Sequence, residues 1–222
     1  MKTRRLWEKF PLVVEMVKND HISQGAIGGG HDFLHALMVA QYADIIAENE
    51  NVGELAWIAG ICHNTDRIFH TASDRDIDRK IWSYLNSGGA MLSFTFQEKE
   101  MIAEAIMNHS KLNDPKDNPV TITLKDADRL PNIGPLLCVR SGQHFHNLPA
   151  CDPHFVETPD PTSSFRDPKT VLRDIEMSLE WEPWLRCPKA IELAKPWFNQ
   201  LRIFVEGFKR QLEETDLLPY PF

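Results

Sequence analysis

Cysteine is scarce in this chain, and its spacing excludes two common structural roles. The four cysteines, Cys62, Cys138, Cys151 and Cys187, lie far apart and form no C-x-x-C pair. That spacing fits neither a zinc ribbon nor a disulfide-stabilised scaffold. We therefore expect reduced thiols, as in a cytoplasmic protein.

Long apolar runs are absent as well. The longest strongly apolar segment, Leu55 to Cys62, is far too short to cross a bilayer. Glu8 and Lys9 interrupt the N-terminal sequence before an apolar stretch reaches the length of a signal peptide. The sequence therefore predicts a soluble, cytoplasmic protein that has no membrane partner.

Positive charge is in deficit, with 24 Lys and Arg against 32 Asp and Glu and a formal net charge of −8. Proteins bind nucleic-acid polymers largely through phosphate contacts from Lys and Arg, so we expect no such polymer as a partner. A small phosphorylated substrate stays open, because one metal ion can reverse the field inside a pocket. With 42% hydrophobic residues, we expect residues 1–222 to form a single domain.

Helical periodicity dominates the sequence. Apolar residues recur every three or four positions from His31 to Glu50, and Asn51 and Gly53 are expected to close that helix. The next segment, 54–63, is apolar nearly all round, which predicts a helix buried at the centre of the fold. Further helices are expected over 74–85, from a Thr95-x-x-Glu98 capping box to 108, over 124–130, from an Asp167-Pro168 start to 180, and over 189–214. Residues 146–166 read as a proline-rich surface loop, and no strand alternation is found, so we expect an all-α bundle.

Three of the nine histidines occupy unusual positions. His35 lies in the first of these helices, His63 ends the buried helix, and His109 ends the helix that the capping box opens. A buried imidazole is costly unless it is paired or bound to a cation. Imidazole together with carboxylate is a ligand set that divalent transition metals accept.

Two carboxylates interrupt the apolar helix over 124–130. Asp126 and Asp128 point to nearly opposite sides of a helix, since 3.6 residues make one turn. Only one of them can then face the core. We therefore expect Asp126 at the surface.

The order of these motifs resembles the HD-domain metal-dependent phosphohydrolases. The resemblance rests on His35 in His-Ala-Leu-Met-Val-Ala, on His63-Asn64 after the apolar helix, and on Ala-Asp128-Arg-Leu. Members of that family carry one histidine, a later His-Asp pair and a distant aspartate on the helices of an all-α bundle. Further likeness in His31-Asp32-x-x-His35, in Asn108-His109-Ser110 and over 126–134 points to a branch of small bacterial HD hydrolases. The resemblance implies an HD-like core over 25–145, with C-terminal helices over 167–222 packed on it.

The resemblance also implies a divalent metal ion, with Mn, Mg, Co, Ni, Zn and Fe all open, held by His35, His63, Asn64 and Asp128. Asn64 stands where the family has an aspartate. An amide offers a carbonyl oxygen without negative charge, so we expect a weaker hold on the ion. Either the chain belongs to a diverged or non-catalytic subgroup, or position 64 has been altered. Pro131 is a second departure, because the branch often has another aspartate there.

The activity implied by the resemblance is hydrolysis of a small phosphorylated substrate, with a nucleotide as one candidate. A bound dication lowers the pKa of its water towards ~7 and neutralises charge on a phosphoryl oxygen. We expect Asp66, His109 and Arg67 to be catalytic, with Asp66 as general acid or base. His31, His109 and Lys125 are the expected substrate-binding residues.

Two other functions stay open. The first is a catalytically impaired HD relative that binds a nucleotide or a partner without turnover, which Asn64 favours. The second is an oxygenase or hydratase on the same scaffold, which would need further histidine ligands between His63 and Asp128. A homo-oligomer is compatible with each of them.

Overall fold

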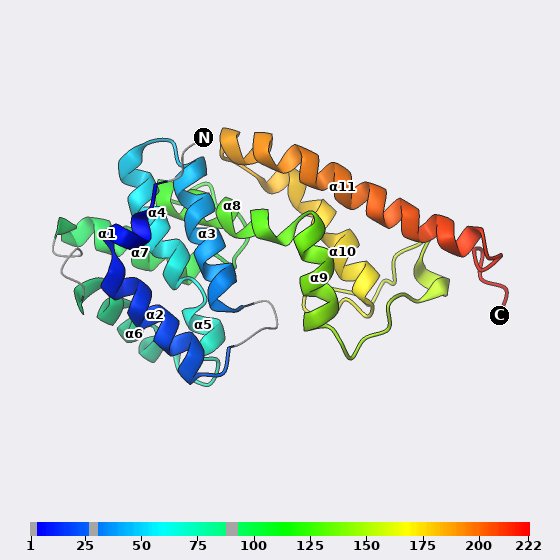
Figure 1. Ribbon diagram of the computed structural model, residues 1–222, viewed down its shortest axis with the longest axis horizontal. Helices are drawn as coiled ribbons and strands as arrows, with labels where there is room; N and C mark the ends of the chain where they lie inside the picture. Colours follow the sequence, from blue (N-terminus) through cyan, green and yellow to red (C-terminus); the bar gives the residue numbers. More distant parts are fainter. Residues whose placement is uncertain (1–3, 27–30, 88–92) are drawn as a thin grey trace. The chain divides into compact units, whose positions relative to one another are not determined.

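The computed structural model describes residues 4–26, 31–87 and 93–222, and the regular structure in these ranges is helical (Figure 1). They contain no strand, only an isolated bridge between Ser164 and Asp167. The predicted all-α fold is therefore confirmed. None of the helices in these ranges is both long and apolar enough to cross a membrane.

The tertiary contacts cluster into two compact units. Unit 1 comprises residues 1–131 and 185–191, and unit 2 comprises residues 132–184 and 192–222. The sequence predicts a single domain over 1–222, with residues 167–222 packed on the core. The division into two units does not test this expectation, so the single-domain organisation stays a prediction.

Unit 1 is built around helix α4. Its helices are α1 (Leu6–Lys9), α2 (Pro11–Ser23), α3 (Phe33–Ile46), α4 (Glu50–Cys62), α5 (Thr65–Ile68), α6 (Asp74–Ser87), α7 (Phe96–Asn108) and α8 (Pro119–Arg129). Helix α4 packs against α3, α7 and α8, and α3 also packs against α8. Every residue of α4 from Leu55 to Cys62 is buried, which confirms the predicted central helix.

A glycine lets α3 and α4 approach closely. A Cβ atom at Gly60 would lie 2.7 Å from Cα and 2.8 Å from N of Ala40. Only a residue without a side chain tolerates that approach. The two helices run side by side in Figure 1, and His35 on α3 thereby comes next to His63 at the end of α4.

One helix boundary differs from the prediction because of a side-chain cap. Helix α3 ends at Ile46, and the Asn49 side chain accepts a hydrogen bond from Val52 N at 3.0 Å to begin α4. Asn51 and Gly53, expected to close the first helix, therefore lie inside the second. Asparagine is among the best N-cap residues, and its bond begins a new helix four residues before Gly53.

A second boundary is also wrong, whereas the capping box is confirmed. Helix α10 (Val171–Ser178) begins after Thr170, whose Oγ1 accepts from Arg173 N at 3.0 Å, and not at Asp167. Lys169 lies between them with a φ of 69°, which a right-handed helix cannot contain. At α7, both reciprocal hydrogen bonds of the Thr95 capping box are present.

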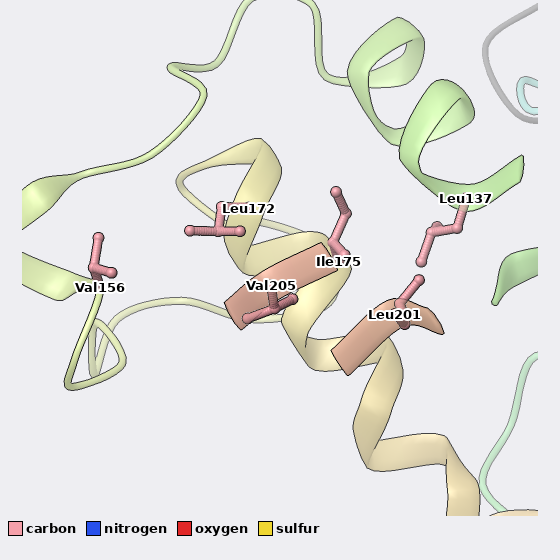
Figure 2. Close-up of a cluster of buried hydrophobic side chains, with 6 residues drawn as sticks. All are labelled: Leu137, Val156, Leu172, Ile175, Leu201 and Val205. Carbon is pink, nitrogen blue, oxygen red and sulfur yellow. The ribbon is translucent and has the colours of Figure 1, made fainter. Parts of the chain in front are cut away.

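Unit 2 has its own apolar core. It contains α9 (Pro135–His144), η3 (Pro153–Phe155), α10, η4 (Leu179–Trp184) and α11 (Pro188–Glu213) from residue 192 onward. The core comes from α9, α10, α11 and the residue that follows η3, and consists of Leu137, Val156, Leu172, Ile175, Leu201 and Val205 (Figure 2). Val156 is 3% exposed, so the proline-rich loop is anchored in this core and is not wholly a surface segment.

Candidate metal centre

Three polar side chains converge within unit 1. His35 lies in the first turn of α3, His63 caps the C-terminus of α4, and Asp128 lies in the last turn of α8. His35 Nε2 is 3.2 Å and His63 Nε2 is 3.6 Å from Asp128 Oδ1, and the two Nε2 atoms are 3.3 Å apart. The structure thus brings together three of the four residues that the resemblance implies as metal ligands.

Local hydrogen bonds orient these rings. His63 Nδ1 donates to Gly60 O at 2.7 Å, so the lone pair of its Nε2 faces the other two groups. Asp32 caps α3 by accepting from His35 N at 2.8 Å, which fixes the turn that carries His35. The Nδ1 atom of His35 is buried and has no hydrogen-bond partner in the described ranges.

The donor set fits a divalent ion. An ion about 2.1 Å from each ligand, in tetrahedral or octahedral geometry, separates neighbouring ligand atoms by about 3.0–3.4 Å. The separations of 3.2, 3.3 and 3.6 Å between the two Nε2 atoms and Asp128 Oδ1 are close to that range. Three electron-rich atoms at these distances repel one another unless a proton or cation lies between them. Two imidazoles and one carboxylate are also ligand types that transition-metal dications accept.

Burial and hydrogen bonding together set the protonation states of His63 and Asp128. It lowers the pKa of His63 well below the usual range, and it lowers the pKa of His31 to about 4. Burial alone would raise the pKa of Asp128, but the hydrogen bond from His35 and the field of the neighbouring imidazoles outweigh it and lower that pKa. At neutral pH, His63 is therefore neutral and Asp128 ionised, the states that metal binding requires.

Asn64 reaches this centre through His31. Its side chain is buried, and its Oδ1 lies 3.3 Å from His31 Nδ1, while its Nδ2 has no partner in the described part of the chain. The His31 ring meets the His35 ring edge-on, with their centroids 6.1 Å apart. The hydrogen bond of the Asn64 side chain thus goes to His31 and not to the other three implied ligands.

His109 brings a further imidazole to the same place. It caps the C-terminus of α7, and its ring is nearly perpendicular to that of His63, with centroids 5.2 Å apart. Its Nδ1 donates to Ile106 O at 2.6 Å, which leaves the Nε2 lone pair for other partners. His63 and His109 are therefore held in the same way, each by the carbonyl three residues earlier.

The other expected site residues differ in their surroundings. Asp66 Oδ1 is buried without a partner among the described residues, and its Oδ2 lies 3.6 Å from Nε of the half-exposed Arg67. Lys125 is engaged elsewhere: its Nζ lies 2.8 Å from Asp117 Oδ2 and donates to Leu112 O at 2.8 Å. The structure therefore lends no support to a substrate-binding role for Lys125.

The expectation for Asp126 is wrong, because this side chain is completely buried. Its Oδ2 accepts the backbone N–H groups of Arg186 and Cys187, both at 2.6 Å, and its Oδ1 lies 3.1 Å from the Arg129 guanidinium. Residues 185–191 return to unit 1 and supply these donors. The two carboxylates of α8 thus have different roles: Asp128 belongs to the candidate metal centre, and Asp126 accepts hydrogen bonds from the backbone of Arg186 and Cys187.

The fold and the site define an all-α protein with a His-His-Asp centre, in which both imidazoles are buried, suited to a divalent cation. The family model of the HD domain matches residues 32–133, which include these three groups, Asn64 and His109. This part of the chain, residues 32–133, thus matches the HD-domain family.

Similar solved structures span almost the whole chain. A Lactobacillus plantarum protein matches with a TM-score of 0.68 and 17% identity, over 93% of this chain and 98% of that one. An HD-superfamily hydrolase from Bacillus thuringiensis matches with a TM-score of 0.66 and 20% identity, over 93% and 97%. Bacillus subtilis YpgQ in complex with ADP matches with a TM-score of 0.61 and 17% identity, over 88% and 97%. These similarities establish the shared fold, and no curated protein matches the sequence.

Proposed function

We propose that this chain is a divalent-metal-dependent hydrolase that acts on a small phosphorylated substrate. The observation that carries this proposal is the convergence of His35, His63 and Asp128, whose ligand atoms lie 3.2 to 3.6 Å apart. The fold shared with an HD-superfamily hydrolase supports it. The ADP complex of the similar YpgQ makes nucleotides the first substrates to test.

The chemistry can be divided among the residues of the centre. A divalent ion held there would lower the pKa of a water molecule and neutralise charge on a phosphoryl oxygen. His109 keeps one ring nitrogen free of the α7 backbone and can accept or return a proton at Nε2. Asp66 Oδ1 can accept a hydrogen bond from a water or a hydroxyl group. Arg67 can pair with a more distant phosphate from its half-exposed position.

The test begins with protein stripped of metal by a chelator. Mn, Mg, Co, Ni, Zn or Fe is then restored singly, and phosphate release is measured on a panel of nucleotides and other phosphorylated metabolites. We expect metal-dependent release that falls at least about 100-fold in His63→Ala and in Asp128→Ala. His146→Ala, which alters an exposed histidine of unit 2, should retain the wild-type rate. A His63→Ala enzyme as fast as wild type would contradict the proposal.

A second candidate is binding without turnover, which the neutral Asn64 favours. Its signature is ADP binding with no phosphate release under any of the six metals.

An oxygenase is the third candidate, because His109 lies next to His63 and could serve a second ion. Metal analysis separates it, since two irons per chain would support oxygenation and one ion per chain would support hydrolysis.

A further inference from the structure

The turn after His63 holds two buried polar atoms that lack partners. Asn64 Nδ2 and Asp66 Oδ1 are shielded from solvent and have no hydrogen-bond partner in the described ranges. Asn64 as a whole is 1% exposed. Buried polar groups in folded proteins are nearly always hydrogen-bonded. A free donor and a free acceptor in the turn that follows His63 therefore indicate that a bound molecule supplies their partners.

The other end of the Asn64 amide is already occupied. Its Oδ1 lies 3.3 Å from His31 Nδ1. An N–H at that nitrogen donates to Oδ1 and leaves the NH₂ end of the amide free, whereas the reversed amide would require an unprotonated Nδ1. His31 thus determines whether Asn64 offers a donor or a carbonyl oxygen to its surroundings.

Building on the proposed hydrolase function, we propose that Asn64 donates a hydrogen bond from Nδ2 to a phosphoryl oxygen of the substrate and does not coordinate the ion. His31 is then a positioning residue that holds the Asn64 amide by its oxygen. The ion keeps His35, His63 and Asp128 as its protein ligands. The ligand set implied by the resemblance is thereby reduced by one residue.

The charge of the centre agrees with this assignment. His35, His63 and Asp128 include a single carboxylate, so a dication leaves the centre with one positive charge in excess. An aspartate at position 64 would cancel that charge. A phosphoryl group is an anion, and it interacts more favourably with a positive centre flanked by an amide donor than with a neutral centre flanked by a carboxylate. The neutral residue at position 64 therefore favours an anionic phosphate ligand.

The test measures ion binding and phosphate binding separately. Asn64→Ala removes the amide donor, Asn64→Ser replaces the amide by a hydroxyl on a shorter side chain that does not reach the position of Nδ2, and Asn147→Ala alters an exposed asparagine as a matched control. Mn²⁺ affinity is measured on the metal-free proteins by electron paramagnetic resonance, and orthophosphate affinity is measured on the Mn²⁺-saturated proteins by calorimetry. Circular dichroism checks the fold, and the serine variant keeps a polar side chain if alanine prevents folding.

We expect Asn64→Ala and Asn64→Ser, which both lack the amide, to bind Mn²⁺ within about threefold of wild type and orthophosphate at least about tenfold more weakly. Asn64→Asp should bind Mn²⁺ more tightly and orthophosphate more weakly. His31→Phe keeps a ring but loses the nitrogen, so it should weaken orthophosphate and leave Mn²⁺ affinity unchanged, which a general loss of structure would not do.

Two results would overturn the assignment in distinguishable ways. If Asn64→Ala and Asn64→Ser weaken Mn²⁺ tenfold or more but leave orthophosphate affinity at saturating Mn²⁺ unchanged, Asn64 is a metal ligand and the hydrolase proposal stands. If wild-type protein binds neither Mn²⁺ nor any of the other five ions, the hydrolase proposal fails together with this one.

Discussion

Replacing Asp126 with alanine tests how residues 185–191 are held in unit 1. The carboxylate accepts from Arg186 N and Cys187 N at 2.6 Å each and pairs with Arg129 at 3.1 Å. Alanine leaves two backbone donors and a largely buried guanidinium without their acceptor. Breaking a buried charge pair costs about 3–5 kcal/mol, and an unsatisfied buried donor about 1–3 kcal/mol. Because water can enter the vacated space and satisfy part of this loss, we expect a total of about 4 kcal/mol.

Chemical denaturation followed by tryptophan fluorescence measures this loss. Asp126→Asn keeps an oxygen for the two N–H groups but loses the charge opposite Arg129, so its cost should be smaller, about 1–2 kcal/mol. Asp78→Ala, which changes an exposed aspartate of α6, should stay within about 0.5 kcal/mol of wild type. An Asp126→Ala protein within about 1 kcal/mol of wild type would refute the role of this carboxylate.

Three further predictions concern the centre and its helices. Mn²⁺ at 100 times its dissociation constant should stabilise the protein by about 2.7 kcal/mol, seen as a rise in Tm that excess chelator abolishes; an unchanged Tm would contradict the site. Without metal, stability should fall as pH decreases from about 6.5 towards 4, because the folded-state pKa of His63 is lowered and that of His31 is lowered to about 4, so the unfolded chain binds protons first. The slope should reach about 1.4 kcal/mol per pH unit for each histidine in urea titrations, and a flat profile would argue against neutral buried rings. Gly60→Ala should destabilise the protein by about 1–3 kcal/mol, because the new Cβ atom would clash with Ala40. Gly207→Ala should stabilise α11 by about 0.5–1 kcal/mol, because a Cβ atom there meets no neighbouring group within 4 Å. Comparable denaturation midpoints for the two variants would count against the close packing of α3 and α4.

The sequence predicts the helical fold because hydrophobic periodicity is a local property of each segment. It predicts the convergence at the centre because the motifs follow the order found in a known family. An apolar segment nearly uniform on all sides predicts the buried α4, and an imidazole at its end is then placed inside the protein. The order of His35, His63 and Asp128 resembles that of the family's metal ligands, and this resemblance predicts that the three residues share one site. Helical spacing alone could not show that their ligand atoms lie 3.2 to 3.6 Å apart.

The surroundings of Asp126 and Lys125 depend on partners that no local pattern reveals, and two helix starts depend on side-chain caps. The donors to Asp126 lie about 60 residues along the chain, and no local pattern reveals that this segment returns to α8. Lys125 likewise is buried against Asp117, although a lysine in such a motif is ordinarily exposed. At Asn49 and Thr170, a single side-chain hydrogen bond decides where a helix begins, and hydrophobic periodicity does not resolve that choice.

The bonds from His63 to Gly60 O and from His109 to Ile106 O form within one turn of chain. Each ring therefore acquires its tautomer and its orientation during folding of its own helix end, without help from an incoming ligand. Little rotational entropy then remains for these rings to lose when a cation arrives. Capture of a metal by the centre that contains the preorganised His63 should be a single fast kinetic phase, with no slow rearrangement after the encounter.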